Sequence, residues 1–259
     1  MIDTSTLHHT TVRDGRAECT CGWYSPRIFG CPEPFATWHQ LAVSETIDNP
    51  YLRAFLAPVT KAEVAALGAI GSEYLAAHVR RDRLAAEYAW AIPTEDVVRK
   101  LAELSPICDL GCGTGYWAKL LRDVGAEVLA VDANPPLEGE NHWHRREAGL
   151  LRQPTSLRHF VDVIKGDAAT FDVPPEQTLL LCWPPYAKGM AAQALSRYGG
   201  SRVVYVGEGD GGCTGDDGFH AALAEQWERT ASYEIPQWDG LHDDVRVYVR
   251  SASRKRSSV

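Results

Sequence analysis

A glycine-rich turn between an apolar segment and the start of a helix is the part of the sequence best suited to hold a ligand. Asp109 closes the apolar segment, and Gly111, Gly113 and Gly115 follow it. Glycines allow positive φ and let a ligand lie against the backbone with no Cβ in the way. The free N–H groups at the helix start favour a carboxylate or phosphate, whereas Asp109 can accept a hydrogen bond from an amine. These two ends describe an amino-acid head group rather than a pyrophosphate.

Two other interpretations of these glycines stay open. Gly113, Gly115 and Ala118 satisfy the dinucleotide-binding pattern G-x-G-x-x-G/A if the count starts late. That interpretation leaves Asp109 and Gly111 unexplained. The glycines can also merely turn a strand into a helix. A phosphate-binding loop of the form G-x-x-x-x-G-K-S/T is absent from the sequence.

Two further acids follow apolar segments. Segment 126–132 reads as a second buried strand that ends in Asp132, and segment 160–164 leads into Asp167. A carboxylate at the end of the second strand is where Rossmann-like sheets hold ribose hydroxyls. Several cofactor classes use this position, so Asp132 supports nucleoside binding without naming the cofactor. Three acids at three strand ends form a strong signal for such a site.

The glycine turn and the three acids resemble those of class I S-adenosylmethionine-dependent methyltransferases. The resemblance implies S-adenosylmethionine as cofactor and an adenine contact from Asp167 and the Ala168 amide. It also implies that aromatic residues ahead of the first strand lie over the cofactor, although core packing is the alternative for them. The cofactor-binding residues expected on this basis are Tyr88, Trp90, Asp109, Gly111, Gly113, Gly115, Asp132, Asp167, Ala168 and Cys182.

The loop after the fourth apolar strand, 183–186, looks like the (Asp/Asn/Ser)-Pro-Pro-(Tyr/Phe) loop of amino-methyltransferases. In that family the polar residue and a proline carbonyl hold an exocyclic amine, and the aromatic ring stacks on the base. Here the polar position is Trp183, whose indole can only donate a hydrogen bond. Trp183, Pro184 and Tyr186 are therefore candidates for contacts to a planar acceptor. A proline pair that merely shapes the loop is the alternative.

Glu208 ends the fifth apolar strand and precedes the glycine-rich loop 209–217. We expect it beside the fourth-strand loop, as a general base or a substrate anchor, and a solvated loop acid is the alternative. A base is needed only if the nucleophile carries a proton, because alignment supplies much of the catalysis of an in-line displacement. His242 is a second candidate base, although a surface histidine near a turn is the simpler explanation.

The first 45 residues combine cysteines, histidines and aromatic rings. Cys19 and Cys21 stand close enough to share a metal ion, and His39 and His9 complete a tetrahedral Cys₂His₂ set. A segment this short needs a cross-link to be stably folded, so we expect one structural zinc ion. Cys31 is an alternative ligand. An aromatic cluster with free thiols is the alternative.

Composition narrows the class of protein. The 259 residues carry a net charge of −8, which disfavours general adhesion to nucleic acid or anionic membranes. No apolar run is long enough to span a membrane, and the N-terminus lacks the layout of a signal peptide. Seven cysteines, two of them in core strands, suggest a reducing cytoplasm. The oligomeric state cannot be inferred.

The elements that must position these residues fall into four parts: a Cys/His-rich module at 1–45, a helical segment at 46–105, a methyltransferase core at 106–250 and a disordered tail at 251–259. Strands and helices alternate in the core, which predicts an α/β fold with a mostly parallel sheet of seven strands. The last two strands should form an antiparallel hairpin. The expected strands are 106–110, 127–131, 160–165, 178–183, 202–206, 231–236 and 244–250, and the expected helices are 34–43, 115–124, 187–197 and 216–228.

Within the helical segment, Thr60 and Glu63 have the form of a capping box. Apolar residues from Val64 to Leu75 recur near helical spacing and predict that the helix continues through them. Arg80, Arg81 and Arg83 are expected on a solvated face, with a phosphate or substrate contact as the alternative. The connection 133–159, which holds His142, Trp143 and His144, should contain at most a short irregular helix.

Three functions follow from the resemblance. The leading one is methylation of a small, planar or nucleotide-like acceptor beneath Trp183, Tyr186 and the loop 207–217. The second is a nucleic-acid base methyltransferase whose N-terminal module holds the strand, and the third is a non-catalytic protein that binds S-adenosylmethionine or a partner. Residues 88–248 are similar to a group of methyltransferase-like proteins from actinobacteria, their phages and fungi, and the Cys/His-rich region resembles small modules of actinobacterial phage proteins. Neither resemblance supplies a substrate.

Overall fold

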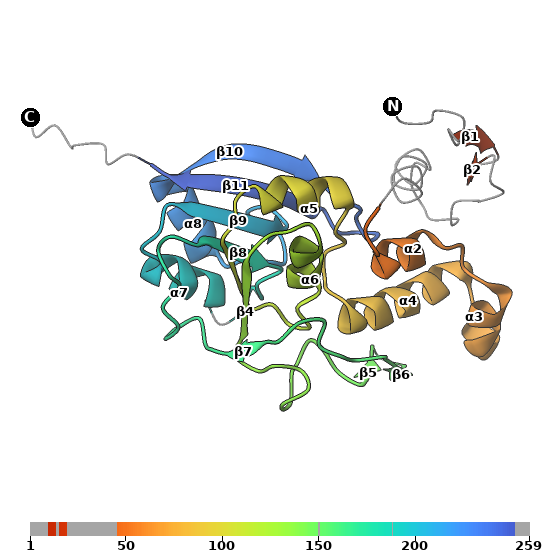
Figure 1. Ribbon diagram of the computed structural model, residues 1–259. Helices are drawn as coiled ribbons and strands as arrows, with labels where there is room; N and C mark the ends of the chain where they lie inside the picture. Colours follow the sequence, from red (N-terminus) through yellow and green to blue (C-terminus); the bar gives the residue numbers. More distant parts are fainter. Residues whose placement is uncertain (1–9, 14–15, 20–45, 150, 188, 252–259) are drawn as a thin grey trace, which may run out of the picture.

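A seven-stranded sheet forms the centre of the computed structural model (Figure 1). The structure describes residues 10–13, 16–19, 46–149, 151–187 and 189–251. In spatial order the strands are β10 (Trp227–Glu234), β11 (Asp244–Arg250), β9 (Arg202–Gly207), β8 (Thr178–Cys182), β3 (Ile107–Leu110), β4 (Val128–Asp132) and β7 (Ile164–Lys165). β11 pairs antiparallel with both β10 and β9, and the other pairs of neighbouring strands in this sheet are parallel. The expected Rossmann-like methyltransferase sheet, with its terminal antiparallel hairpin, is confirmed.

Helices cover both faces of this sheet. The helices are α2 (Pro50–Leu56), α3 (Lys61–Ala66), the 3₁₀ turn η2 (Gly68–Ile70), α4 (Glu73–Glu87), α5 (Glu95–Ala102), α6 (Tyr116–Asp123), α7 (Met190–Arg197) and α8 (Asp217–Gln226). Alternate residues of each strand point to opposite faces, so the core has two halves. One half packs α2, α5 and α6 against the sheet, and the other packs α7 and α8. Within the described ranges no helix is both long and apolar enough to cross a membrane.

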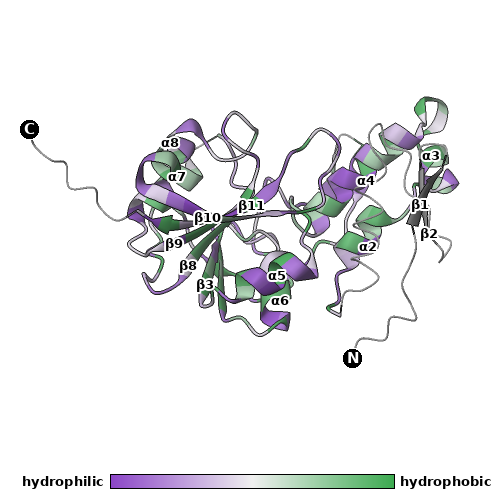
Figure 2. Cartoon of the chain, turned by 90° about the horizontal axis from the view of Figure 1, so that it is seen from above, coloured by the Kyte–Doolittle hydropathy of each residue, from purple (hydrophilic) through white to green (hydrophobic). Residues whose placement is uncertain are grey.

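Helices α2, α3 and α4 lie at the opposite end of the structure from α7 and α8 (Figure 2). The capping box of Thr60 and Glu63 is present. The expected continuous helix through 64–75 is wrong, because α3 ends at Ala66, Gly68 adopts φ +61° and α4 begins after Ser72. Ile70 is 68% exposed, so the apolar spacing in this stretch does not mark a core face.

Arg80 is buried rather than solvated, with 8% of its surface exposed. Its guanidinium donates to the Glu63 carboxylate and to the backbone carbonyls of Ala57 and Pro58. Partial burial alone would raise the pKa of Glu63, but hydrogen bonds from Arg80 and Thr60 hold it at about 2. The expectation of a solvated face is therefore wrong for Arg80, which ties α4 to the chain between α2 and α3.

Two strands differ from the expected ranges. β7 is only Ile164–Lys165, because the preceding residues cross over the glycine turn instead of pairing in the sheet. There the Phe160 N–H donates to the Thr114 carbonyl at 2.9 Å. β10 begins at Trp227, directly after α8, rather than at residue 231.

Two short antiparallel pairs stand outside the central sheet. The connection 133–159 contains β5 (Glu147–Ala148) and β6 (Gln153–Pro154) and no helix in its described residues. Near the N-terminus, β1 (Thr10–Arg13) pairs with β2 (Arg16–Cys19). The helix expected at 34–43 and the tail after 251 lie outside the described residues.

Replacing Arg80 with alanine should destabilise the fold, because it removes the buried donor to the Glu63 carboxylate and to the carbonyls of Ala57 and Pro58. We expect a loss of about 2 kcal/mol in the free energy of unfolding, measured by urea denaturation. Arg53→Ala is the matched control, because the Arg53–Asp48 pair is mostly exposed and should contribute less than about 0.5 kcal/mol. Equal losses for the two variants would contradict the structural role of Arg80.

Candidate functional site

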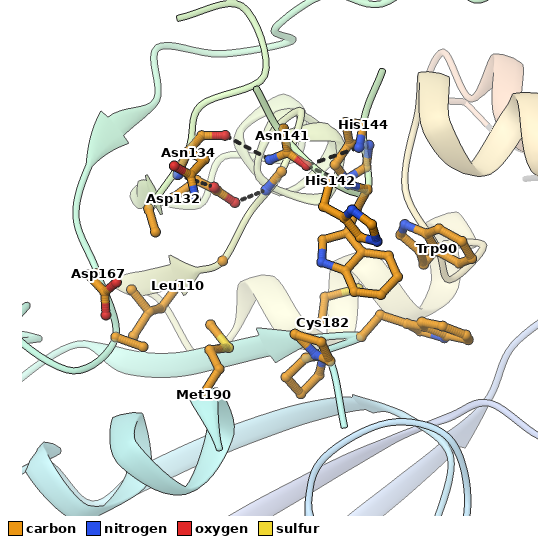
Figure 3. Close-up of a pocket in the computed structure, with 18 of the residues that line it drawn as sticks. Trp90, Leu110, Asp132, Asn134, Asn141, His142, His144, Asp167, Cys182 and Met190 are labelled. Carbon is orange, nitrogen blue, oxygen red and sulfur yellow. Dashed lines mark hydrogen bonds between the residues drawn. The ribbon is translucent and has the colours of Figure 1, made fainter. Parts of the chain in front are cut away.

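A cavity of about 270 Å³ opens where β3, β4 and β8 end, close to the lower end of small-molecule sites, roughly 300 Å³. Open α/β sheets bind ligands at this edge. Figure 3 shows Asp132 and Asp167 on one side of the cavity and His142 and Trp90 on the other. Of the residues expected from the sequence, the lining includes Trp90, Gly111, Gly113, Asp132, Asp167, Ala168, Cys182, Trp183 and Pro184.

Two residues of the glycine turn must be glycine because neighbouring side chains pack closely against their backbone. Gly111 and Gly113 have φ of +81° and +56°, where side chains are disfavoured. A Cβ at Gly113 would lie 2.2 Å from His144 Nε2, and one at Gly111 would lie 2.6 Å from the Met190 methyl. The bare backbone at these positions therefore leaves room for the surrounding side chains and exposes the turn to the cavity.

Gly115 serves a different purpose. It has φ +75° at the N-cap of α6, and a Cβ there would lie 2.6 Å from the Val161 side chain. It is not among the residues that line the cavity. Its glycine is explained by packing against the crossing segment 160–163.

Asp132, at the end of β4, joins the glycine turn to the neighbouring strand. Its carboxylate accepts hydrogen bonds from the Gly113 N–H at 2.9 Å and the Asn134 N–H at 2.8 Å. A carboxylate can accept about four hydrogen bonds, so Asp132 retains capacity for hydroxyl donors from the cavity. This arrangement suits a ribose.

Asp109 lies directly beneath the turn and does not line the cavity. It is 1% exposed, and its Oδ1 atom has no hydrogen-bond partner. Burial, together with the nearby Asp132 carboxylate, raises the pKa of Asp109 to about 7. An unpartnered buried carboxylate oxygen calls for an explanation, and an ammonium group bound at the turn would provide one.

Asp167 and Ala168 follow the short strand β7 and both line the cavity. The Asp167 Oδ1 atom accepts from the Ala169 N–H at 2.8 Å, which orders the turn. The residues around the cavity therefore fit S-adenosylmethionine in three respects: a bare glycine turn, an unpartnered acid beneath it, and two more acids along the strand ends.

The loop 141–144 completes the cavity and was not identified as functional from the sequence. Asn141 holds the loop, because its side chain donates to the Asn134 carbonyl at 2.7 Å and accepts from the N–H groups of Trp143 and His144. Asn134, Asn141, His142, Trp143, His144, Met190 and Gln193 are lining residues that sequence reasoning missed. The cluster of histidine and tryptophan at 142–144 was the only signal.

His144 packs between this loop and the glycine turn. Its Nδ1 atom lies 3.0 Å from the Ala86 carbonyl, which can only accept, so Nδ1 carries the proton. Burial lowers the pKa of His144. The neutral imidazole therefore presents the lone pair of Nε2 towards Gly113.

Three indole rings form one wall of the cavity, which we call the indole wall: Trp90, Trp143 and Trp183. The Trp90 and Trp183 rings stack with centroids 5.0 Å apart and planes at 24°. Trp143 meets Trp90 edge to face at 5.7 Å. Such a wall is suited to a flat, aromatic ligand.

Two aromatic candidates lie away from the cavity. Tyr88 stacks on Tyr51 at 5.2 Å, as in the core-packing alternative. Tyr186 is 46% exposed, and its hydroxyl donates to Asp217 Oδ1 at 3.0 Å. The structure brings neither ring into the lining.

Glu208 lies in a separate hollow formed by 208–213 and His242. Burial opposes ionisation of its carboxylate, but hydrogen bonds from the N–H groups of Cys213 and His242 lower its pKa below the usual value. Glu208 thus orders its own loop, and the structure does not bring it to the indole wall. The loop 207–217 does not line the main cavity either, so the expected roof is replaced by loop 141–144 and Trp90.

Most of the proposed zinc ligands lie outside the residues that the structure describes. Cys19 ends β2, whereas His9, Cys21, Cys31 and His39 lie outside the described residues. Among the residues that the structure describes, no group of three or more potential ligands is placed to hold a metal ion.

Asp109 should make the stability of the protein fall as pH rises. Its pKa is about 7 in the folded chain and 3.8 in the unfolded chain, so the folded state binds the proton more tightly. The stabilisation is complete below pH 3.8 and is lost as pH rises through 7. We expect the wild type to lose stability relative to Asp109→Asn between pH 4 and 8. The loss, measured as the difference between their free energies of unfolding, should be at most about 4 kcal/mol. Parallel stability curves for the two proteins would contradict this assignment.

A family model described as a methyltransferase domain matches residues 77–174, from α4 to just beyond β7. No curated protein sequence matches the chain.

Several solved structures resemble the fold at low similarity. Magnesium protoporphyrin IX methyltransferase from Synechocystis PCC 6803, with bound S-adenosylmethionine, is 15% identical over 67% of this chain and 84% of that chain, with a TM-score of 0.41. The 1,6-didemethyltoxoflavin-N1-methyltransferase of Burkholderia thailandensis is 14% identical over 95% and 99%, with a TM-score of 0.39. An rRNA methylase from Streptococcus thermophilus is 12% identical over 60% and 95%, with a TM-score of 0.35. The residues that match this methyltransferase-domain model include the glycine turn, Asp132 and Asp167.

Proposed function

We propose that this protein transfers a methyl group from S-adenosylmethionine to a small, planar acceptor that lies against the indole wall. The observation that carries the proposal is that one cavity is lined both by the glycine turn and by Trp90, Trp143 and Trp183. A cofactor held at the turn and a flat acceptor at the wall would therefore meet in the same enclosed space.

The cofactor half of the proposal assigns a role to each acid. Asp109 would face the ammonium group, Asp132 the ribose hydroxyls, and Asp167 with the Ala168 amide the adenine amine. The cofactor would supply an electrophilic methyl group on a sulfonium. The protein would contribute chiefly by holding the acceptor in line with that methyl group, and such positioning accounts for much of the rate of a displacement reaction.

The nature of the wall favours an acceptor other than an exocyclic nucleobase amine. At the position where amino-methyltransferases carry a polar acceptor, Trp183 offers an indole whose N–H already donates to Asp243 Oδ1 at 2.8 Å. It has no lone pair to accept from an amine. Stacking on the rings is then the main interaction available to the acceptor. Trp183 and Pro184 keep their proposed roles at the acceptor, whereas Tyr186 and Glu208 lie elsewhere.

Methyl incorporation from labelled S-adenosylmethionine should occur in a metabolite extract and not in purified DNA or RNA. Trp143→Ala should reduce incorporation by about tenfold or more, because it removes a stacking surface. Tyr74→Ala is the control, since Tyr74 is a half-exposed aromatic residue on α4 that does not line the cavity. Label in nucleic acid would favour a nucleic-acid base methyltransferase, and label in neither would favour a non-catalytic binding protein.

We also propose that residues 1–45 form a separate module around one zinc ion held by Cys19, Cys21, His39 and His9. The support is the combination of thiolates and imidazoles, which suits zinc better than calcium or magnesium. The proposed cofactor residues all lie beyond residue 85, so the module should be dispensable for cofactor binding. The resemblance of this module to small modules of actinobacterial phage proteins stays a prediction.

Elemental analysis of the full-length protein should find close to one zinc per chain, and Cys21→Ala should lower that content because it removes a ligand. The control is Cys213→Ala, which changes an exposed cysteine far along the sequence. Less than about half an equivalent of zinc, unchanged by Cys21→Ala, would support the aromatic-cluster alternative instead.

A further inference from the structure

Trp183 has a backbone conformation that its side chain does not favour. Its φ is +52°, in the left-handed region that is uncommon for non-glycine residues. The Trp183 N–H donates to the Val206 carbonyl at 2.8 Å, and the next residue, Pro184, accepts from the Gly215 N–H at 2.9 Å. Strained residues persist when their surroundings hold them, and they gather at ligand sites.

Asp243 holds the far edge of that ring. It immediately precedes β11, is 1% exposed, and its Oδ1 atom accepts from the Trp183 indole N–H at 2.8 Å. The loop around it is fixed as well, because the Asp243 carbonyl accepts from the Gln237 side chain at 2.8 Å. A hydrogen bond to an ionised acceptor is stronger than one between neutral groups, so this bond is well suited to hold a strained residue in place.

The Trp183 ring, which lines the cavity, is linked to the other two rings of the indole wall. The Trp183 ring stacks on Trp90 at 5.0 Å, and Trp90 in turn meets Trp143 at 5.7 Å. The Arg81 guanidinium lies 5.9 Å from the centre of the Trp90 ring. Asp243 thus contacts the indole wall through its hydrogen bond with Trp183, and the stack links it on to Trp90, although Asp243 does not line the cavity itself.

We propose that Asp243 is a positioning residue that sets the orientation of Trp183, and through it Trp90, in the acceptor half of the cavity. The proposal rests on the proposed function for the meaning of that cavity, and it assigns Asp243 to acceptor alignment rather than to cofactor binding. The acceptor would contact the rings in the orientation that Asp243 sets, and would not contact the carboxylate itself.

The surroundings of Asp243 make this contact sensitive to pH. Burial raises the pKa of Asp243 to about 7, although the hydrogen bond from Trp183 acts to lower it. Glu208 and Asp244 also raise it, and Arg81 lowers it. Because the hydrogen bond favours the ionised form, protonation below pH 7 weakens it, and the ring orientation should loosen in acid.

Circular dichroism of the full-length protein tests the proposal without a known acceptor, because two stacked indoles give an exciton couplet. The part of the spectrum lost in Trp183→Phe defines the contribution of the Trp90–Trp183 pair. In wild type this contribution should weaken in acid with a midpoint near pH 7. In Asp243→Asn it should persist without that titration, since the amide oxygen still accepts. In Asp243→Ala it should be largely lost at pH 8.

Two controls separate this effect from others. Asp109→Asn should keep the titration, although Asp109 also has a pKa of about 7. Asp239→Asn, an exposed acid in the same loop, should leave the couplet unchanged. A wild-type couplet in Asp243→Ala, or an unchanged midpoint in Asp243→Asn, would overturn the proposal. If Asp243→Ala does not fold, the titration of Asp243→Asn still decides.

Calorimetry with S-adenosylhomocysteine on the same proteins keeps the two proposals distinct. Asp243→Ala should bind it within about twofold of wild type, because Asp243 does not line the cavity and contacts none of the three acids assigned to the cofactor. A loss of more than tenfold would assign Asp243 to the cofactor and overturn the positioning role. Absence of binding in wild type would instead refute the proposed function and leave the couplet result standing.

Discussion

The hydrogen bond from the Gly113 N–H to the Asp132 carboxylate is the interaction on which the site depends. It fixes the turn after β3 to the end of β4, so that bare backbone and a strand-end acid face the same cavity. His144 packs within a short distance of Gly113 and closes the other side. A side chain at Gly113 would force these groups apart, which is why a glycine is needed there.

The acceptor half of the cavity is built from elements that are distant in sequence. Trp90 precedes the first strand of the sheet, Trp143 lies on the loop after β4, and Trp183 follows β8. Parallel strands end at one edge of a sheet, so residues that follow them meet there whatever their separation along the chain. Asp243, ahead of β11, adds a fourth segment that holds Trp183 by its indole.

The sequence was sufficient for features set by local patterns. Strand-end acids such as Asp132 and the glycine turn follow directly from apolar segments and from backbone chemistry. The loop around Asn141 could not be foreseen, because its shape comes from side-chain bonds to distant backbone, such as that between His144 and the Ala86 carbonyl. Glu208 was expected at the acceptor because it ends a strand, yet nearby N–H groups draw its carboxylate into its own loop. Local sequence patterns do not predict hydrogen bonds between polar groups that are distant in the sequence.

A calorimetric titration with S-adenosylhomocysteine, with NADH as competitor, tests whether the glycine turn and the strand-end acids bind this cofactor. We expect wild type to bind S-adenosylhomocysteine and Gly113→Ala, whose new Cβ would meet His144 Nε2 at 2.2 Å, to bind it at least about tenfold more weakly. Gly139→Ala should bind as wild type does, since a Cβ there meets nothing within 4 Å. Tight binding of NADH without binding of S-adenosylhomocysteine would contradict an S-adenosylmethionine site at this turn.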